Sequence, residues 1–251
     1  VCGRGELQMA VLIETMRREG YEFMVSKPQV ITKQENGKVL EPVESVYLDL
    51  EEEHTGIVTE KLSKRKGRMA NLHNDGSGRV ILEFKIPSRG LIGFRNEFLT
   101  DTKGTGILNA LFDSYAPWFG AIPQRNTGVI IADRQGKVTP YASLAMADRG
   151  ELFVDIGIEV YKGMVVGERN KSGDLDVNII REKKLTNMRA SSKDSTVILR
   201  PPKRLSLDQC IEFIAEDELI EVTPDSLRMR KMELDINKRI SQAKKNKLSD
   251  G

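Results

Sequence analysis

The chain has 251 residues, with 39 Lys and Arg against 37 Asp and Glu and a formal net charge of +2. Its composition, 39 % hydrophobic and 30 % charged, is typical of a water-soluble globular protein, and no apolar run approaches the length of a membrane helix. Two cysteines exclude a disulfide scaffold and indicate a reducing compartment, so we expect a cytoplasmic protein. The length predicts two or three domains. The chain starts at Val1 without an initiating Met or a signal peptide, which favours a start inside a larger protein.

Residues 1–40 read as half of a domain. Apolar spacing predicts a helix over 6–19, with Gly20 in the position of a C-terminal cap. An alternating strand is expected to follow and to continue past Pro28 to Ile31. One helix and one strand cannot bury both of their faces, so we expect the other half of this unit to precede Val1.

Residues 41–118 are predicted to form a complete α+β domain of the ferredoxin-like type. The expected order is strand, helix, strand, strand, helix, strand, which is the split-βαβ pattern. The elements are predicted at residues 43–50, 55–66, 69–72, 80–86, 88–99 and 107–112.

Residues 119–251 are predicted to form a mainly β domain with one helix. Short strands separated by turn residues indicate a small antiparallel barrel or sandwich. They are expected at 128–132, 138–146, 152–154, 163–167, 175–180, 219–222 and 227–232. Ser206 opens the expected helix, with Gln209 in the position of a capping box, and a basic tail ends the chain.

The sequence offers no catalytic, cofactor-binding or metal-ligating constellation. There is no P-loop motif, and the tetrapeptide 133–136, which matches a D-x-x-G switch motif by its letters, is better explained as a hairpin turn. His54 and His73 lack partners at metal spacing and are interpreted as surface residues. Cys210 lies on an apolar helical face, so we expect an inert buried thiol.

Basic residues gather in local clusters, although the net charge is near zero. Residues 181–204 contain eight basic and two acidic residues, and residues 227–251 contain eight and three. A polar, basic loop over 181–195 on a β scaffold is typical of a surface that binds folded RNA, because lysine and arginine neutralise phosphates. The candidate RNA-binding residues of this loop are Lys183, Lys184, Asn187, Arg189 and Lys193. A solvated loop without a partner is the alternative.

A second candidate RNA-binding cluster is the turn formed by Lys64, Arg65, Lys66 and Arg68, for which a solvated charged turn is an equal alternative. The aromatic residues within 115–119 could offer stacking surface, but an apolar anchor at a domain junction explains them better.

Several motifs resemble the elongation factor G-like translational GTPases. The segment 3–8 is similar to part of domain III of that family, and segments 41–46, 64–67, 86–87 and 104–106 are similar to its domain V. Segments 88–95, 183–191, 201–202, 215–224 and 227–231 narrow the resemblance to the BipA/TypA family and, for all but the first, to its special C-terminal domain.

The resemblance implies the C-terminal portion of a ribosome-associated GTPase that takes part in stress adaptation and large-subunit assembly. It implies rRNA as partner, with the tRNA acceptor end as a further contact, no membrane partner, and a monomeric fragment. GTP and Mg²⁺ would belong to an N-terminal G domain that this chain lacks, so the chain itself is expected not to be an enzyme and to hold no cofactor.

Two other classes of protein remain as alternatives. One is a freestanding RNA-binding ribosome-maturation module without a nucleotide switch. The other is a metabolic enzyme on a ferredoxin-like scaffold, which the lack of a catalytic constellation disfavours. A P-loop encoded upstream of Val1 would support the GTPase over the freestanding module.

Overall fold

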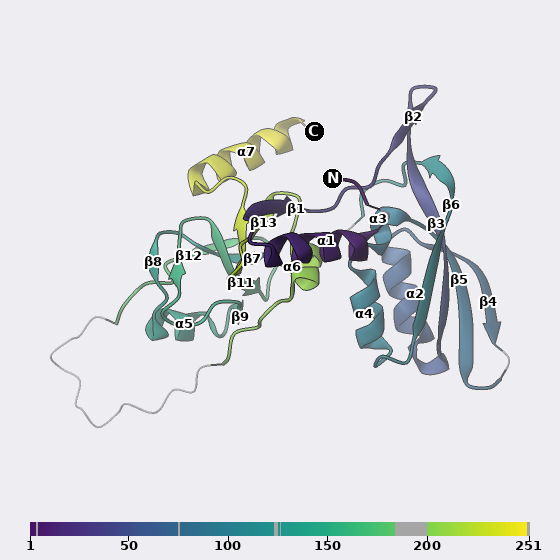
Figure 1. The fold of residues 1–251 in the computed structure, drawn as a ribbon, viewed down its shortest axis with the longest axis horizontal. Helices are drawn as coiled ribbons and strands as arrows, with labels where there is room; N and C mark the ends of the chain where they lie inside the picture. The colour runs from purple at the N-terminus through teal and green to yellow at the C-terminus, as the bar shows by residue number, and fades with distance from the viewer. Residues whose placement is uncertain (4, 75, 123–124, 126, 184–199, 250–251) are drawn as a thin grey trace. The chain divides into compact units, whose positions relative to one another are not determined.

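The computed structural model describes residues 1–251 except 4, 75, 123–124, 126, 184–199 and 250–251 (Figure 1). Its contacts divide the chain into a central unit, Pro28–Gln124, and a terminal unit made of Val1–Lys27 and Arg125–Gly251. The domain boundaries expected at residues 40 and 118 stay predictions. Among the described helices, none is long and apolar enough to cross a membrane.

The central unit has the ferredoxin-like fold that the sequence predicts. Its antiparallel sheet has the order β6-β3-β5-β4, and β2 extends one end of β3 as a short hairpin. The elements are β2 (Lys33–Glu35), β3 (Lys38–Glu51), η1 (Glu52–His54), α2 (Thr55–Lys64), β4 (Arg68–Asn74), β5 (Arg79–Pro87), α3 (Ser88–Leu91), α4 (Phe94–Asp101) and β6 (Ile107–Pro117).

Helices α2 and α4 cover one face of this sheet (Figure 1). Val46, Leu48 and Leu50 of β3 are fully buried against them, whereas Tyr47, between two of these residues, is exposed on the other face. The period-two pattern of the sequence therefore selects the face that packs on the helices.

The helix expected over 88–99 is divided into two. Gly93 has a left-handed φ of 74°, which ends α3 and re-aims the chain into α4. Gly90 is also required, because a Cβ there would lie 2.7 Å from the carbonyl oxygen of Arg65. Apolar periodicity predicts the buried face of both helices but does not show this break.

The terminal unit is built on a mixed sheet with the strand order β1-β13-β14-β11-β7-β12, with β9 paired to β11. Every pair in this sheet is antiparallel except β12 with β7. The elements are α1 (Glu6–Arg18), β1 (Phe23–Ser26), β7 (Val129–Ala132), β8 (Gly136–Lys137), α5 (Pro140–Met146), β9 (Gly150–Leu152), β10 (Glu159–Val160), β11 (Met164–Arg169), β12 (Leu175–Val177), α6 (Leu207–Phe213), β13 (Glu218–Val222), β14 (Leu227–Lys231) and α7 (Ile236–Ser249).

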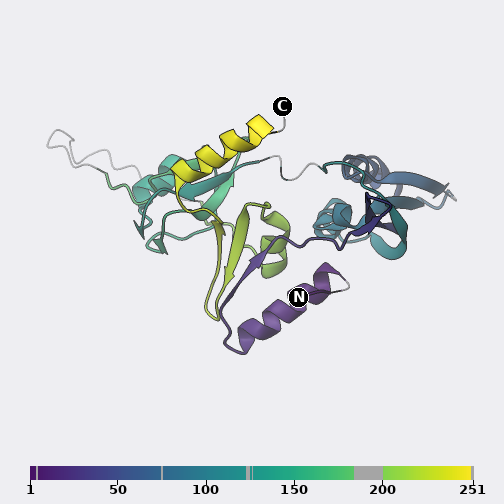
Figure 2. The same ribbon diagram turned by 90° about the horizontal axis from the view of Figure 1, so that it is seen from above.

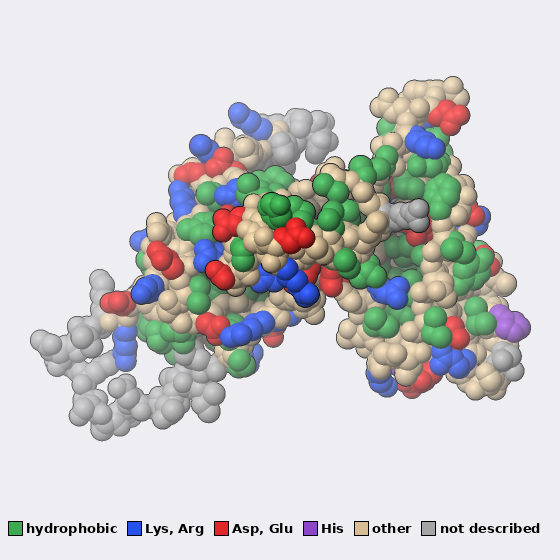
Figure 3. Space-filling model, in the orientation of Figure 1, with side chains coloured by type: hydrophobic (Ala, Val, Ile, Leu, Met, Phe, Trp, Pro, Cys, Tyr) green, Lys and Arg blue, Asp and Glu red, His purple; other side chains and the backbone are tan. Residues whose placement is uncertain are grey.

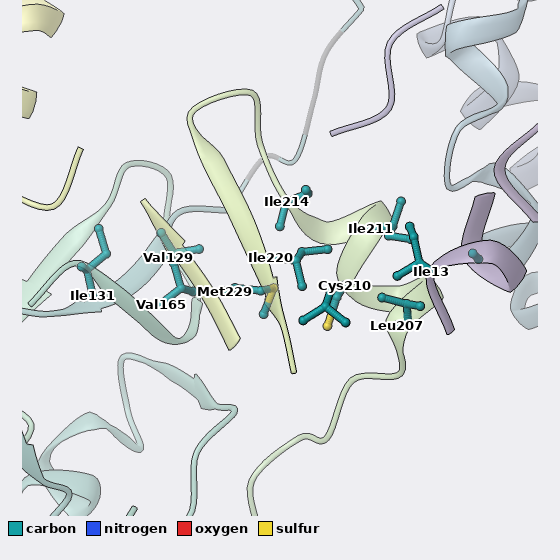
Figure 4. Close-up of a cluster of buried hydrophobic side chains, with 12 residues drawn as sticks. Ile13, Val129, Ile131, Val165, Leu207, Cys210, Ile211, Ile214, Ile220 and Met229 are labelled. Atoms are coloured by element: carbon teal, nitrogen blue, oxygen red, sulfur yellow. The ribbon is translucent and has the colours of Figure 1, made fainter. Parts of the chain in front are cut away.

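Helix α1 and strand β1 find their packing partners within the terminal unit. β1 pairs with β13 in antiparallel register, and Ile13 of α1 lies in one core cluster with Leu207 and Ile211 of α6 (Figures 2 and 4). The strand ends at Ser26 and does not continue past Pro28 as expected, since proline has no N–H to donate to a ladder.

Both faces of the central strand β7 are buried. Val129 and Ile131 join the core cluster that contains α1 and α6 (Figure 4), whereas Ile130 and Ala132 join a second cluster that contains α5. This explains why the sequence of β7 is an unbroken apolar run and does not alternate.

The prediction of one helix in the C-terminal region was wrong, because α5 and α7 are helices too. Residues 138–146 were expected to be a strand, but Thr139 accepts a hydrogen bond from the backbone N–H of Ala142 at 3.2 Å and caps α5, with Pro140 at its first turn. The tail contains α7, described below.

Candidate nucleic-acid interface

The basic loop 181–195 begins at a residue that is bonded to the terminal unit. At its start, the hydroxyl of Thr139 donates a hydrogen bond of 2.6 Å to the carbonyl oxygen of Arg181, and the Arg181 guanidinium lies 5.8 Å from the centre of the Tyr141 ring. Beyond the loop, the backbone N–H of Lys203 donates to the carbonyl oxygen of Leu152 at 2.8 Å. The chain is therefore held where the loop begins, and again at Lys203, eight residues after the loop ends.

Only one of the five loop candidates lies in the described part of the chain. Lys183 is exposed, next to the anchored Arg181. Lys184, Asn187, Arg189 and Lys193 lie outside the described residues, and their role in RNA binding stays a prediction.

The residues of the second basic cluster, 64–68, have different roles in the structure. Arg65 holds elements of the fold together, whereas the other three basic residues are exposed. Arg65 donates to the carbonyl oxygens of Gly90 and Ile92 at 3.0 and 2.8 Å, and its other terminal nitrogen lies 2.9 Å from Glu97 Oε1. Its guanidinium also lies over the Phe94 ring. Arg65 thus ties the end of α2 to the segment that joins α3 and α4, and much of its bonding capacity is already used.

Lys64, Lys66 and Arg68 are exposed. Lys64 pairs with Glu60 one helical turn away. Lys66 has a left-handed φ of 68° at the end of α2. The next residue must be glycine, since a Cβ at Gly67 would lie 2.9 Å from the Leu62 carbonyl oxygen. Lys66 and Arg68 remain the better candidates for phosphate contacts.

Cations already cover rings of the aromatic segment 115–119. The Arg89 guanidinium lies 3.8 Å from the centre of the Trp118 ring, and Lys33 and Arg68 lie over Tyr115 and Phe119. Cation–π contacts of this kind use the ring faces that a stacked base would need, which favours the anchor interpretation.

A third basic element, helix α7, was not recognised as a helix from the sequence. The Asp235 carboxylate accepts hydrogen bonds from the backbone N–H groups of Asn237 and Lys238 at 2.8 and 3.3 Å, which is an N-terminal cap. This pattern of an Asp before a helix was a signal that could have been used. Lys244 and Lys245 are exposed on the helix, and basic side chains stand along it at the top of the view in Figure 3.

His54 and Cys210, the two side chains considered above as candidates for metal binding or nucleophilic chemistry, are both buried in the structure. His54 is buried, not on the surface as predicted, and its ligand atom lies within 4.8 Å of those of Glu51 and Glu53. Lys103 pairs with Glu53 Oε1 at 3.1 Å, so an ammonium already balances this acidic group. Cys210 is buried as expected, and burial raises the pKa of its thiol to about 12.

The tetrapeptide 133–136 is not a hairpin turn. It joins β7 to β8, and these strands belong to different sheets, with β8 paired to β10. Gly136 has a φ of 153°, and a Cβ there would meet Ile180 at 2.8 Å. The segment is thus a bend in which the positive φ of residue 136 favours glycine.

Two family models together match most of the chain. Residues 127–236 match the model of the TypA/BipA C-terminal domain, and residues 38–126 match that of the elongation factor G C-terminus. A solved structure from Thermus thermophilus is similar over 33 % of this chain and 12 % of its own, with a TM-score of 0.31 and 22 % identity.

Curated relatives extend the match to almost all of the chain. It is 52 % identical over 242 residues to the large ribosomal subunit assembly factor BipA of Salmonella typhimurium, covering 95 % of this chain and 40 % of the relative. It is 50 % identical over 248 residues to the protein of the same name from Bacillus subtilis, covering 98 % and 40 %. The chain thus spans about 40 % of the length of these relatives. Two adjoining domain matches and this identity show that the chain belongs to the BipA/TypA family.

Proposed function

We propose that this chain is the ribosome-binding portion of a BipA-type translational GTPase that takes part in assembly of the large ribosomal subunit. The observation that carries the proposal is the 52 % identity over 242 residues with a protein named large ribosomal subunit assembly factor. The basic loop, the basic turn and α7 supply the chemistry, since lysine and arginine neutralise the phosphates of RNA.

The contacts of the basic loop with the terminal unit support a role of this loop in binding. The 181–195 loop begins at Arg181, which is bonded to Thr139, and the chain beyond the loop is bonded to Leu152 through Lys203. Fixed points before and after a loop reduce the conformational freedom that it loses on binding, which lowers the entropic cost of ordering it on RNA. We propose rRNA as its main ligand, with the tRNA acceptor end as a further contact.

GTP hydrolysis is assigned to a G domain outside this sequence. The sequence contains no P-loop, the motif whose backbone and lysine hold nucleotide phosphates. GTP and Mg²⁺ would thus act on this chain only by changing the arrangement of domains and thereby its affinity for ribosomes. We further propose a monomeric, cytoplasmic protein that serves in stress adaptation.

The proposal is tested by co-sedimentation of the full-length protein with purified 50S subunits over a series of salt concentrations. The test variant changes Lys183, Lys184, Arg189 and Lys193 to Ala. The matched control removes four exposed lysines elsewhere, Lys38, Lys103, Lys137 and Lys171. We expect the loop variant to bind more weakly and with a smaller salt dependence than the control. Equal binding of both variants would overturn the role of the loop, and absence of binding by the unmodified protein would overturn the proposed function.

A further inference from the structure

We propose that helix α7 is a basic arm that binds RNA phosphates and whose direction is fixed by Arg239. This inference rests on the proposed function, because it assumes that the protein binds RNA. It adds a binding element beyond residue 236, where the match to the TypA/BipA C-terminal domain ends.

The charge of α7 has one sign. The helix Ile236–Ser249 contains five basic residues and no acidic one. Lys238 and Lys245 are seven residues apart, so they lie on the same side of the helix, about 10 Å from each other along its axis. Both are exposed, as is Lys244. Such a row of ammonium groups matches a row of phosphates.

Arg239 holds the helix to the body of the terminal unit. One terminal nitrogen donates to the carbonyl oxygens of Glu233 and Leu234, at 3.0 Å each, and the other pairs with the carboxylate of Asp176 in β12. The side chains of Arg239 and Asp176 are only 15 % and 18 % exposed. Partly buried, charge-assisted bonds in a fork geometry are stronger and more directional than exposed ion pairs.

Two further contacts hold the first turn of α7. Lys162 lies 2.6 Å from Asp235, the residue that caps the helix. Leu234 packs on Gly163, whose missing Cβ would otherwise lie 2.6 Å from the Leu234 side chain. Asp176, Lys162 and Gly163 all lie in or beside the sheet, so the start of the arm is tied to a rigid element at several points.

RNA fits this helix better than a membrane surface. Amphipathic helices that bind membranes need a broad apolar face. The large apolar side chains described in α7 are Ile236, which is half-buried, and Ile240, which is 49 % exposed. This apolar area is small, whereas the basic residues are spread along the helix.

Three variants of the full-length protein distinguish the effect of the lysine charges of α7 from the effect of its direction, which Arg239 fixes. The first changes Lys238, Lys244 and Lys245 to Ala and removes the proposed contacts. The second, Arg239→Lys, keeps the net charge but cannot make the three-acceptor fork of the guanidinium. The control removes three exposed lysines elsewhere, Lys38, Lys137 and Lys171. Affinity is measured for 50S subunits, for protein-free 23S rRNA, and for vesicles of phosphatidylcholine and phosphatidylserine.

We expect the triple lysine variant to bind 23S rRNA at least tenfold more weakly than the control, with a slope of log K against log salt that is smaller by about 2 to 3. Arg239→Lys should weaken binding several-fold with little change of slope. Circular dichroism and thermal melting check that every variant is folded.

Each possible result is decisive. If the triple variant binds RNA as the control does, α7 is not a contact. If it binds weakly but Arg239→Lys binds normally, the arm acts as an unanchored tail and the fixed direction is wrong. Loss of vesicle binding without loss of RNA binding would assign α7 to a membrane. Normal binding of the unmodified protein to 50S subunits in any of these cases leaves the proposed function intact.

Discussion

The ammonium nitrogen of Lys231 lies 2.9 Å from Glu218 Oε1, although the two side chains are only 2 % and 0 % exposed. Burial alone would raise the pKa of Glu218, but the Arg125 guanidinium and Lys231 hold it below its ordinary value. Burial likewise opposes the charge of Lys231, but Glu218 and Asp174 hold its pKa above the ordinary value. Both residues are therefore charged. Their ion pair links strand β13 to strand β14, and Glu218 also pairs with Arg125.

We expect Lys231→Met to lower the free energy of unfolding of the terminal unit by about 3 kcal/mol. Removing one member of a buried ion pair leaves the other charge desolvated, which costs far more than loss of an exposed pair. The control is Lys203→Met, whose ion pairs at 3.5 and 4.0 Å are solvated and should contribute under about 1 kcal/mol. Urea unfolding measures both, and equal effects would contradict the charged state of the buried pair.

The change Arg65→Ala should destabilise the central unit by about 2–3 kcal/mol, because it removes charge-assisted hydrogen bonds to two carbonyl oxygens and to Glu97. Thermal melting of the variant measures this loss.

The change Lys66→Gly, by contrast, should stabilise the central unit by about 1 kcal/mol, because glycine adopts the left-handed conformation of residue 66 without strain. Thermal melting should show a higher melting temperature than that of the unmodified protein. If Lys66→Gly weakens binding to 50S subunits despite higher stability, Lys66 is a phosphate contact.

The capping box of α6 gives a further prediction. The Ser206 hydroxyl accepts the backbone N–H of Gln209 at 3.3 Å, and the Gln209 side chain accepts that of Ser206 at 2.9 Å. Ser206→Ala should therefore cost about 1 kcal/mol of unfolding free energy. Ser172→Ala, in an exposed turn, serves as a control with little expected change. Urea titration followed by far-UV circular dichroism is the measurement.

The anchor of α7 should weaken only in strong acid. The hydrogen bond from Lys162 and those from two backbone N–H groups lower the pKa of Asp235 to about 2. Because this folded-state pKa lies below the unfolded value of about 3.9, the stabilisation is fully present above about pH 4 and is lost as the pH falls toward 2.

The amide resonances of Asn237 and Lys238 report this titration in an NMR spectrum. We expect a midpoint near pH 2, and no such transition in Asp235→Asn, which can still accept a hydrogen bond from the helix. A midpoint near 4 would show that the contacts with Asp235 are absent in solution.

The helices and strands that could be predicted are those whose apolar pattern or cap lies within their own residues. The apolar residues Val46, Leu48 and Leu50 predicted the strand β3, and Ser206 with Gln209 predicted the start of α6. The ferredoxin-like order of the central unit followed from such signals. In contrast, the strand expected at 138–146 was wrong, because short apolar segments do not distinguish a strand from a helix and the Thr139 cap was overlooked.

The candidate site could be predicted only as clusters of charge. Charge counts located the basic loop, turn and tail, but could not show that Arg65 is bonded to carbonyl oxygens of Gly90 and Ile92. Those acceptors lie 25 and 27 residues further along the chain, and only the packing of α2 against the α3–α4 segment brings them together. The same is true of Arg239 and Asp176, which are 63 residues apart.

The sequence by itself determined the fold of the central unit, the family and the positions of the basic clusters, because periodicity, caps and motifs are local properties of the chain. Only the tertiary structure decided which of the described basic residues face solvent and which hold the protein together. It also decided that β1 pairs with β13 and that β7 is buried on both faces. These outcomes depend on contacts between distant residues, whose energies are set by burial and geometry that no local pattern records.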